Sequence, residues 1–179
     1  MTNQPKRALL IVDMINDFAF PHGSLLLQHT TSIIKPILQI KQQFKTDNNP
    51  IIYVNDHYNL WQADFQKIIK TCRNEKNTDI IDKISPDKDD FFLIKPKYSA
   101  FYGTALNTLL HHLNVTHLTI TGIAGNICVL FTANDAYMRE YTLSVPQNGL
   151  ASASPQDNEY ALLMMKHVLK ADISPYHPN

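Results

Sequence analysis

The sequence contains little cysteine, no net charge and no long apolar segment. Only two cysteines, Cys72 and Cys128, occur among 179 residues, which excludes a disulfide framework and a four-cysteine zinc site. Sixteen basic and sixteen acidic side chains leave no excess of positive charge that would attract nucleic acid or an anionic membrane. The longest apolar runs, at 8–12 and 123–131, are far too short to span a bilayer. We therefore expect neither a nucleic-acid partner nor a membrane.

The sequence does contain enough apolar material for a folded core. Hydrophobic residues make up 44% of the chain, which excludes general disorder, and 179 residues fit one domain, 1–179. The polar residues 1–7 are followed by only five apolar residues before Asp13, too few for a secretory signal. We therefore expect a single-domain protein of the cytoplasm.

Short apolar runs alternate along the chain with segments of helical spacing. The runs are continuous, as is typical of strands buried on both faces. They lie at 8–12, 50–55, 91–94, 118–121 and 141–145, with a sixth short edge strand expected at 171–173. Helical spacing is found at 33–44, 65–72, 106–113, 128–137 and 155–168, with Ser32, Thr104 and Ser154 as candidate caps. The polar stretch 73–90 is expected to be a long surface excursion.

This alternation predicts the class of fold. Strands that alternate with helices pair in parallel through right-handed crossovers. The chain is therefore expected to form an α/β fold, a three-layer α/β/α sandwich with a mostly parallel central sheet. In such open sheets, ligands bind beyond the carboxyl ends of the strands.

Three chemically useful side chains follow predicted strands. Asp13 ends the first strand, Lys95 follows the third, and Cys128 lies after the fourth in the first turn of a helix. A helix start and a nearby ammonium lower the pKa of a thiol, and a carboxylate can accept its proton. Gly125 gives the preceding turn backbone freedom, and N–H groups near Cys128 would form an oxyanion hole. Lys97 competes with Lys95 for the same role.

Other candidate residues have simpler interpretations. Cys72 ends an amphipathic helix and is expected to fill space, and Asp17 is expected to be a turn residue. The eight histidines show no metal-ligand spacing, and no glycine-rich phosphate or dinucleotide motif is present. We therefore expect no metal and no cofactor.

Three segments resemble the isochorismatase-like cysteine hydrolases, a likeness that extends from about Arg7 to Asp172. They are Ile-Val-Asp-Met-Ile-Asn-Asp-Phe at 11–18, Lys-Pro-Lys-Tyr-Ser-Ala-Phe at 95–101, and Thr-Gly-Ile-Ala-Gly-Asn-Ile-Cys-Val at 121–129. The resemblance implies an Asp–Lys–Cys triad of Asp13, Lys95 and Cys128. It favours Lys95 over Lys97 because the family's lysine stands four residues before the serine.

The resemblance also implies features around the nucleophile. A cis peptide is expected between Ala124 and Gly125, where it would turn the N–H of Gly125, with that of Cys128, toward an oxyanion. Related proteins are usually dimers or tetramers, so a homo-oligomer is expected. Side chains expected to contact a small-molecule substrate are Phe18, Asn55, Asp56, Trp61, Tyr98 and Phe101.

The resemblance leaves the reaction open. Family members act on nicotinamide, isochorismate, carbamoylated amines and ureido compounds. Nicotinamidases bind a metal through an Asp-x-His pair, but here Tyr58 stands two residues after Asp56, which argues against a metal-dependent nicotinamidase. The presence of Cys128 favours hydrolysis of a C–N bond. The alternatives are a vinyl-ether hydrolase with Asp13 as acid, and a non-catalytic interaction protein.

Overall fold

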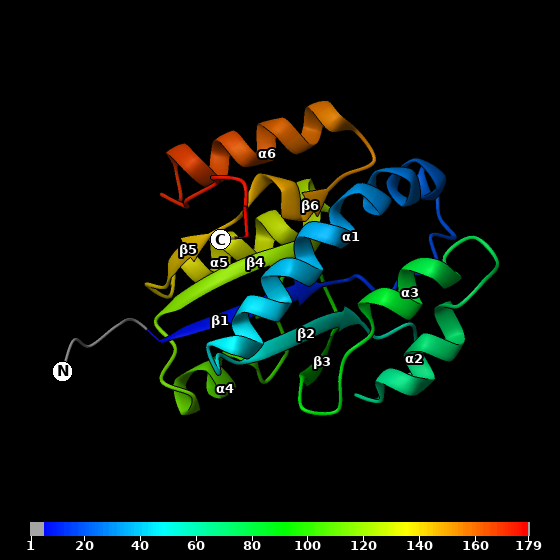
Figure 1. Cartoon of the computed structure of the whole chain (residues 1–179), viewed down its shortest axis with the longest axis horizontal. Helices are drawn as coiled ribbons and strands as arrows, with labels where there is room; N and C mark the ends of the chain where they lie inside the picture. Colours follow the sequence, from blue (N-terminus) through cyan, green and yellow to red (C-terminus); the bar gives the residue numbers. More distant parts are fainter. Residues whose placement is uncertain (1–5, 179) are drawn as a thin grey trace.

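The computed structural model describes residues 6–178 and has a parallel sheet at its centre. Five strands lie in the order β3-β2-β1-β4-β5, and a two-residue strand, β6, also pairs with β4 (Figure 1). Every pairing is parallel. The strands are β1 (Arg7–Val12), β2 (Ile51–Asp56), β3 (Phe91–Lys95), β4 (His117–Ile123), β5 (Thr142–Ser144) and β6 (Leu150–Ala151).

Helices cover both faces of this sheet (Figure 1). They are α1 (Gly23–Thr46), α2 (Phe65–Cys72), α3 (Thr78–Ile84), α4 (Leu106–His112), α5 (Leu130–Tyr137) and α6 (Pro155–His167), with a π-helical turn, η1 (Gly125–Val129), and a 3-10 turn, η2 (Gln147–Gly149). The expected three-layer α/β/α sandwich with a parallel sheet is confirmed. No helix in the described part of the chain is both long enough and apolar enough to cross a membrane.

The continuous apolar sequence of β1 explains how two cores form on one strand. Ala8, Leu10 and Val12 point into a core shared with α4, α5 and α6, whereas Leu9 and Ile11 point into a core shared with α1. Successive side chains of a strand face opposite sides of the sheet, so both sets must be apolar. All five side chains are at most 1% exposed.

The structure corrects three expectations about secondary structure. Helix α1 begins at Gly23, well before Ser32, whose hydroxyl instead donates to the carbonyl of His29 within the helix. The excursion at 73–90 contains α3, which buries three isoleucines against the core. Residues 171–173 form only an isolated bridge, in which Asp172 pairs with Ser144.

The expected caps behave differently from one another. Ser154 caps α6 by accepting the N–H of Asp157. The hydroxyl of Thr104 accepts the N–H of Leu106 although Ala105 occupies the cap position of α4. In both cases a short side-chain oxygen satisfies a backbone donor that the first helical turn leaves unpaired.

Candidate active site

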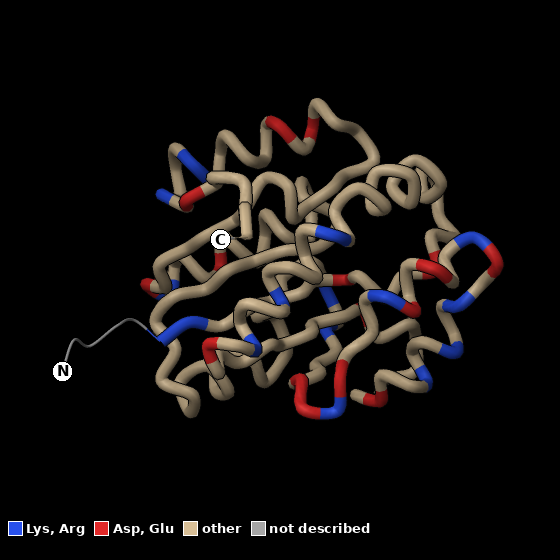
Figure 2. Tube along the Cα trace, in the orientation of Figure 1, with Lys and Arg blue, Asp and Glu red and all other residues tan. Residues whose placement is uncertain are grey.

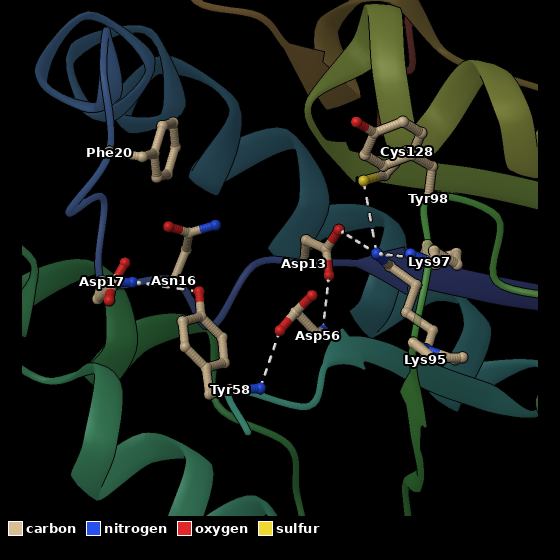
Figure 3. Close-up of a pocket in the computed structure, with 11 residues that line it drawn as sticks. Asp13, Asn16, Asp17, Phe20, Asp56, Tyr58, Lys95, Lys97, Tyr98 and Cys128 are labelled. Atoms are coloured by element: carbon tan, nitrogen blue, oxygen red, sulfur yellow. Dashed lines mark hydrogen bonds and ion pairs between the residues drawn. The ribbon is translucent and has the colours of Figure 1, made fainter. Parts of the chain in front are cut away.

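Asp13, Lys95 and Cys128 meet at the carboxyl edge of the sheet (Figure 3). The Lys95 Nζ lies 2.8 Å from Asp13 Oδ2 and 3.4 Å from Cys128 Sγ, and it donates to the Lys97 carbonyl at 3.1 Å. Asp13 follows β1, Lys95 ends β3 and Cys128 lies in η1 after β4. Because these strands are parallel, three segments far apart in sequence deliver their side chains to one place.

The geometry of Asp13 is set by its position just after β1. Its backbone has a positive φ of 53°, an uncommon conformation for a residue other than glycine. Its N–H donates to the carbonyl of Val54 at 3.1 Å, and its Oδ1 accepts the N–H of Asp56 at 2.8 Å. The neighbouring strand β2 therefore orients the carboxylate that faces Lys95.

Two glycines, one near the end of β4 and one at the start of η1, are required ahead of Cys128, each for a different reason. Gly122 has a φ of 118°, and a Cβ there would lie 2.1 Å from the carbonyl oxygen of Val12. Gly125 does not need a positive φ, contrary to the freedom expected of it. Position 125 has room only for glycine, since a Cβ would lie 2.1 Å from Asn158 Oδ1 and 2.7 Å from a methyl of Leu150.

The cis peptide bond lies one residue earlier than expected. It joins Ile123 to Ala124, not Ala124 to Gly125. Strand β4 ends at Ile123 and the π-helical turn begins at Gly125, so the change of chain direction falls at the end of the strand itself. The assignment of the Gly125 and Cys128 N–H groups to an oxyanion hole remains a prediction.

Hydrogen bonds in η1 shape the backbone around the thiol. The carbonyl of Ala124 accepts the N–H groups of both Ile127 and Val129. The hydroxyl of Ser152, which donates to Asn158, accepts the N–H of Asn126. A π-type turn widens the helix locally, and such turns occur often at functional sites.

The pKa of the Cys128 thiol is shifted in the direction opposite to the one that the sequence suggested. Burial raises the pKa of Cys128 above its usual range; the carboxylate of Asp13 raises it further, and Lys95 only partly offsets these effects. The lowered pKa expected for this thiol is therefore not found, because burial and the neighbouring carboxylate act in the opposite direction.

The neighbouring carboxylate and ammonium are shifted as well. Burial raises the pKa of Asp13 above its ordinary value, although Lys95 acts in the opposite direction. Burial would lower the pKa of Lys95, but Asp13 and Cys128 together raise it. Lys95 therefore stays an ammonium, and Asp13 holds a proton more readily than a free aspartate does.

A cavity of about 570 Å³ opens beside these groups. Figure 3 shows Asn16, Phe20 and Tyr58 across the open space from Cys128 and Lys95. Its lining residues are Asp13, Asn16, Asp17, Phe20, Asp56, Tyr58, Lys95, Pro96, Lys97, Tyr98 and Cys128. A volume of this size suits a small molecule.

Two of the six residues expected to contact substrate, Asp56 and Tyr98, line this cavity. The other four lie elsewhere. Phe18 and Phe101 are 8% and 5% exposed and pack in the two cores. Trp61 is 65% exposed and stacks on His57 outside the cavity, with ring centroids 4.0 Å apart.

Asn55 has a different role from the one expected of it. The side chain is only 2% exposed, and its amide accepts the N–H of Ile15 and donates to the carbonyl of the same residue. Asn55 therefore fixes the backbone of the loop that follows Asp13. Such a two-sided hydrogen bond satisfies a buried amide and fixes the backbone it contacts.

Sequence reasoning missed four residues of the cavity wall and misjudged two others. Asn16, Phe20, Tyr58 and Pro96 follow strand ends, which is the available signal, but loop conformation decides which of them turn inward. Lys97 was expected only as a competitor of Lys95, and it lines the cavity as well. Asp17 was expected only to stabilise a turn. It does so by accepting the N–H of Ala19, and it also lines the cavity.

Comparison with known proteins establishes the family. A family model described as the isochorismatase domain matches residues 7–173. The chain belongs to the isochorismatase family. The isochorismatase family protein YaaI of Bacillus subtilis (strain 168) is 58% identical over 168 residues, which cover 94% of this chain and 93% of YaaI. The family resemblance inferred from the three motifs is confirmed, and the chain is an isochorismatase-like hydrolase.

Two solved structures resemble this member of the isochorismatase family along nearly its whole length. The nicotinamidase SaPncA from Staphylococcus aureus superposes with a TM-score of 0.75 at 27% identity, covering 97% of this chain and 100% of SaPncA. The N-carbamoylsarcosine amidase from Thermoplasma acidophilum superposes with a TM-score of 0.73 at 30% identity, covering 95% and 96% of the two chains. Both neighbours are amidases by name.

Proposed function

We propose that this protein is a cysteine amidohydrolase that cleaves a C–N bond of a small amide or of a ureido or carbamoyl compound. One observation carries the proposal: the ammonium of Lys95 lies between the Asp13 carboxylate and the Cys128 thiol at the wall of a cavity. A nucleophile, a base and a fixed cation in contact are what acyl transfer requires.

In the first half of the reaction, Asp13 removes the proton of Cys128 as the sulfur attacks the substrate carbonyl. A C–S bond forms, and the carbonyl π electrons move to the oxygen, where backbone N–H groups of the turn before Cys128 stabilise them. The tetrahedral intermediate then expels the amine. Asp13 returns its proton to the departing nitrogen, and a thioester remains on Cys128.

In the second half, water attacks the thioester. Asp13 takes a proton from the water, the C–S bond breaks, and the proton passes to the sulfur, which regenerates the thiol. The raised pKa of Cys128 favours deprotonation that is coupled to the attack. The raised pKa of Asp13 suits a group that must both accept and return a proton.

The similar solved structures support a C–N bond as the target. The amides hydrolysed by a nicotinamidase and by an N-carbamoylsarcosine amidase share a carbonyl carbon bonded to nitrogen. The cavity wall combines polar side chains with the aromatic rings of Phe20, Tyr58 and Tyr98. Such a lining fits a small planar amide or ureide that presents both N–H groups and a flat face.

One observation favours a second candidate, a vinyl-ether hydrolase of the isochorismatase type. The raised pKa of Asp13 would also suit a general acid that protonates the enol ether. In that reaction Lys95 would position a substrate carboxylate, and Cys128 would take no part. The two candidates therefore differ in whether the thiol is needed.

The test is a hydrolysis screen of small amides, ureides, carbamoylated amines and isochorismate with the wild type and Cys128→Ala. We expect the wild type to release ammonia or an amine, and Cys128→Ala to lose turnover while its far-UV circular dichroism is unchanged. A Cys128→Ala protein that is fully active on the same substrate would exclude covalent catalysis. If that substrate is isochorismate, the vinyl-ether hydrolase is the correct assignment.

Alkylation separates both enzymes from a non-catalytic protein on this fold. Cys128 is partly exposed and lines the cavity, whereas Cys72 is 1% exposed and does not line it. We expect iodoacetamide at neutral pH to modify Cys128 much faster than Cys72, as read by peptide mass spectrometry. Equal, slow rates at the two thiols would argue for a non-catalytic protein.

A further inference from the structure

The segment that follows Asp13 is not held by a helix or a strand. Residues 14–22 contain neither, and the backbone is left-handed at Asp13 and again at Phe18, with φ values of 53° and 55°. The backbone groups of such a segment need partners that no regular structure provides. Two of its residues, Asn16 and Asp17, line the cavity. What holds this segment therefore decides where two side chains of the cavity wall lie.

Side chains from two other parts of the chain supply the partners. Asn55 of β2 binds both the N–H and the carbonyl of Ile15. Asn77, which lies between α2 and α3, donates from its Nδ2 to the carbonyl of the next residue, Asn16, at 2.8 Å. Strand β2 thus fixes the part of the segment beside Asp13, and the connection between α2 and α3 fixes the part that lines the cavity.

Asn77 uses its amide for this contact and not to cap a helix. It occupies the cap position of α3, where an asparagine ordinarily accepts an N–H of the first turn, yet its side chain makes no such bond. The residue is 0% exposed. Its Nδ2 also donates to the carbonyl of Cys72 at 2.8 Å, and its Oδ1 accepts the N–H of Asn74 at 2.8 Å. A buried amide with these partners has one favourable orientation.

The rest of the connection between α2 and α3 is exposed and charged. Glu75 and Lys76 lie there at the edge of the molecule (Figure 2). Asn74 is exposed as well and donates to the carbonyl of Asp17 at 2.9 Å, but water competes for both of these groups. In this connection, the contact that Asn77 makes with the cavity segment is therefore the better protected one.

The orientation of the Asn16 side chain indicates what the held segment does. Its Oδ1 accepts the N–H of Phe18 at 2.8 Å, and only the oxygen of an amide can accept. The Nδ2 is therefore left for the cavity, and Figure 3 shows it on the side toward Asp13 and Cys128. A donor at this place suits a carbonyl or carboxylate oxygen of a bound molecule.

We propose that Asn77 is a positioning residue of the candidate site. By holding the carbonyl of Asn16, it places the Asn16 amide so that Nδ2 donates to an acceptor oxygen of the substrate, away from the bond that is cleaved. This role rests on the proposed function, because it needs a small amide or ureide in the cavity. Asp13 does not depend on Asn77, since Val54 and Asp56 of β2 hold it. Asn77 therefore sets the affinity for substrate and not the rate of the chemical step.

Steady-state kinetics on the substrate found by screening test this role. Asn16→Ala and Asn77→Ala are each expected to raise KM about three- to tenfold, as loss of one hydrogen bond does, and to leave kcat within about twofold. The double variant should have the KM of Asn16→Ala alone, because Asn77 acts through Asn16. An unchanged KM in Asn77→Ala, or a double variant in which the two effects multiply, would overturn the proposal.

Asn148 provides the matched control. Its amide also binds one residue from both sides, because it donates to the carbonyl of Tyr176 and accepts the N–H of Tyr176, both at 2.9 Å, and it does not line the cavity. Asn148→Ala should leave KM at the wild-type value, and an equal rise in KM would show that the effect is not specific to Asn77. If Asn77→Ala does not fold, Asn77→Ser carries the same expectation, because serine lacks the amide that reaches Asn16.

Hydrogen exchange tests the positioning without any substrate. The N–H groups of residues 15, 17, 18 and 19 are all accepted by side chains, so their exchange reports how firmly the segment is held. By mass spectrometry, peptides from 14–20 should exchange about three- to tenfold faster in Asn77→Ala, and at the wild-type rate in Asn148→Ala. Unchanged exchange in Asn77→Ala would overturn the inference even in an active amidohydrolase. A wild type that hydrolyses no compound of the screen would contradict the proposed function instead.

Discussion

Two lysines of this protein are buried beside carboxylates, and only one of them belongs to the candidate active site. Lys41 of α1 is 5% exposed and Lys95 at the end of β3 is 2% exposed. The Lys41 Nζ lies 2.8 Å from Asp87, 2.7 Å from Asp90 and 2.9 Å from the hydroxyl of Tyr53. None of these three partner side chains lines the cavity.

The two lysines therefore perform different tasks with similar chemistry. Lys41 joins α1 to the loop before β3, and its charge is neutralised by two carboxylates. Lys95 shares its charge between one carboxylate and a thiol, and it lines the cavity. The comparison shows that burial beside an acid does not identify a catalytic lysine. Contact with a nucleophile and a position on an open cavity are what identify one.

The largest expected difference between the two lysine sites concerns the carboxylates beside the lysines. Asp13→Asn should lower kcat roughly 10⁴-fold, because an amide cannot accept the proton of Cys128. Asp90→Asn, the matched change beside Lys41, should leave kcat unchanged in the folded protein. Steady-state kinetics on the substrate found by screening would measure both. Similar activity in the two variants would remove the distinction between the sites.

For the stability of the protein, in contrast to its activity, the larger effect is expected at Lys41. Lys41→Met leaves the carboxylate of Asp90 buried without its cation, since that side chain is only 4% exposed. Removing one partner from a buried pair costs about 3–5 kcal/mol in the free energy of unfolding. Urea denaturation of Lys41→Met would measure this loss, and kcat of the folded fraction should match the wild type. A loss below about 1 kcal/mol would mean that the pair is solvated.

The pH dependence of the reaction should report the environment of Asp13. Because burial raises its pKa, the acid limb of kcat/KM should lie above the ordinary value of 3.8 for aspartate. Lys95 acts to lower that pKa, so Lys95→Met should move the limb to higher pH, whereas Lys41→Met should not. Initial rates between pH 4 and 8 would record the shift. An acid limb that stays in place in Lys95→Met would contradict the assignment of Asp13 as base.

The raised pKa of Asp13 also makes the stability of the folded protein depend on pH, in the direction opposite to activity. A group whose pKa is raised on folding favours the folded state while it is protonated. The contribution of Asp13 to stability is therefore present below its ordinary pKa and is lost as pH rises through the raised one. The candidate site gives up stability under the conditions in which its base is active.

The smallest expected effect belongs to Asp87, the exposed carboxylate partner of Lys41. Asp87 is about half exposed, and hydrogen bonds from Lys41 and Lys45 lower its pKa. Its contribution to stability is present above the ordinary pKa of aspartate and is lost as pH falls through the lowered one. Asp87→Asn should cost only about 0.2–1 kcal/mol near neutral pH, measured by urea denaturation. A larger cost would show that solvent screens this pair poorly.

The residues that carry the proposed chemistry were predictable because each one lies at the end of a parallel strand or in the turn that follows it. Continuous apolar runs mark such strands, and parallel strands end at one edge, so Asp13, Lys95 and Cys128 were expected to meet. The choice of Lys95 over Lys97 came from the family resemblance. In the structure Lys97 contributes its carbonyl to Lys95, which no pattern in the sequence indicates.

The parts that were not predictable depend on how loops pack. Phe18 and Phe20 stand two residues apart after the same strand, and only the fold turns Phe18 into a core and Phe20 toward the cavity. Asn55 was expected at the substrate and instead holds Ile15. The helix α3 was missed because the polar composition of 73–90 favoured a surface loop, and only the fold shows that its isoleucines are buried.

The sequence by itself determined the α/β fold, the family, and the three groups at the edge of the sheet. These follow from patterns that are local, since each strand, turn and motif is contained in a few adjacent residues. The tertiary structure alone decided the raised pKa of Cys128, the cavity wall and the different roles of the two buried lysines. Those properties depend on exclusion of water by distant segments, and burial is a property of the packed chain as a whole.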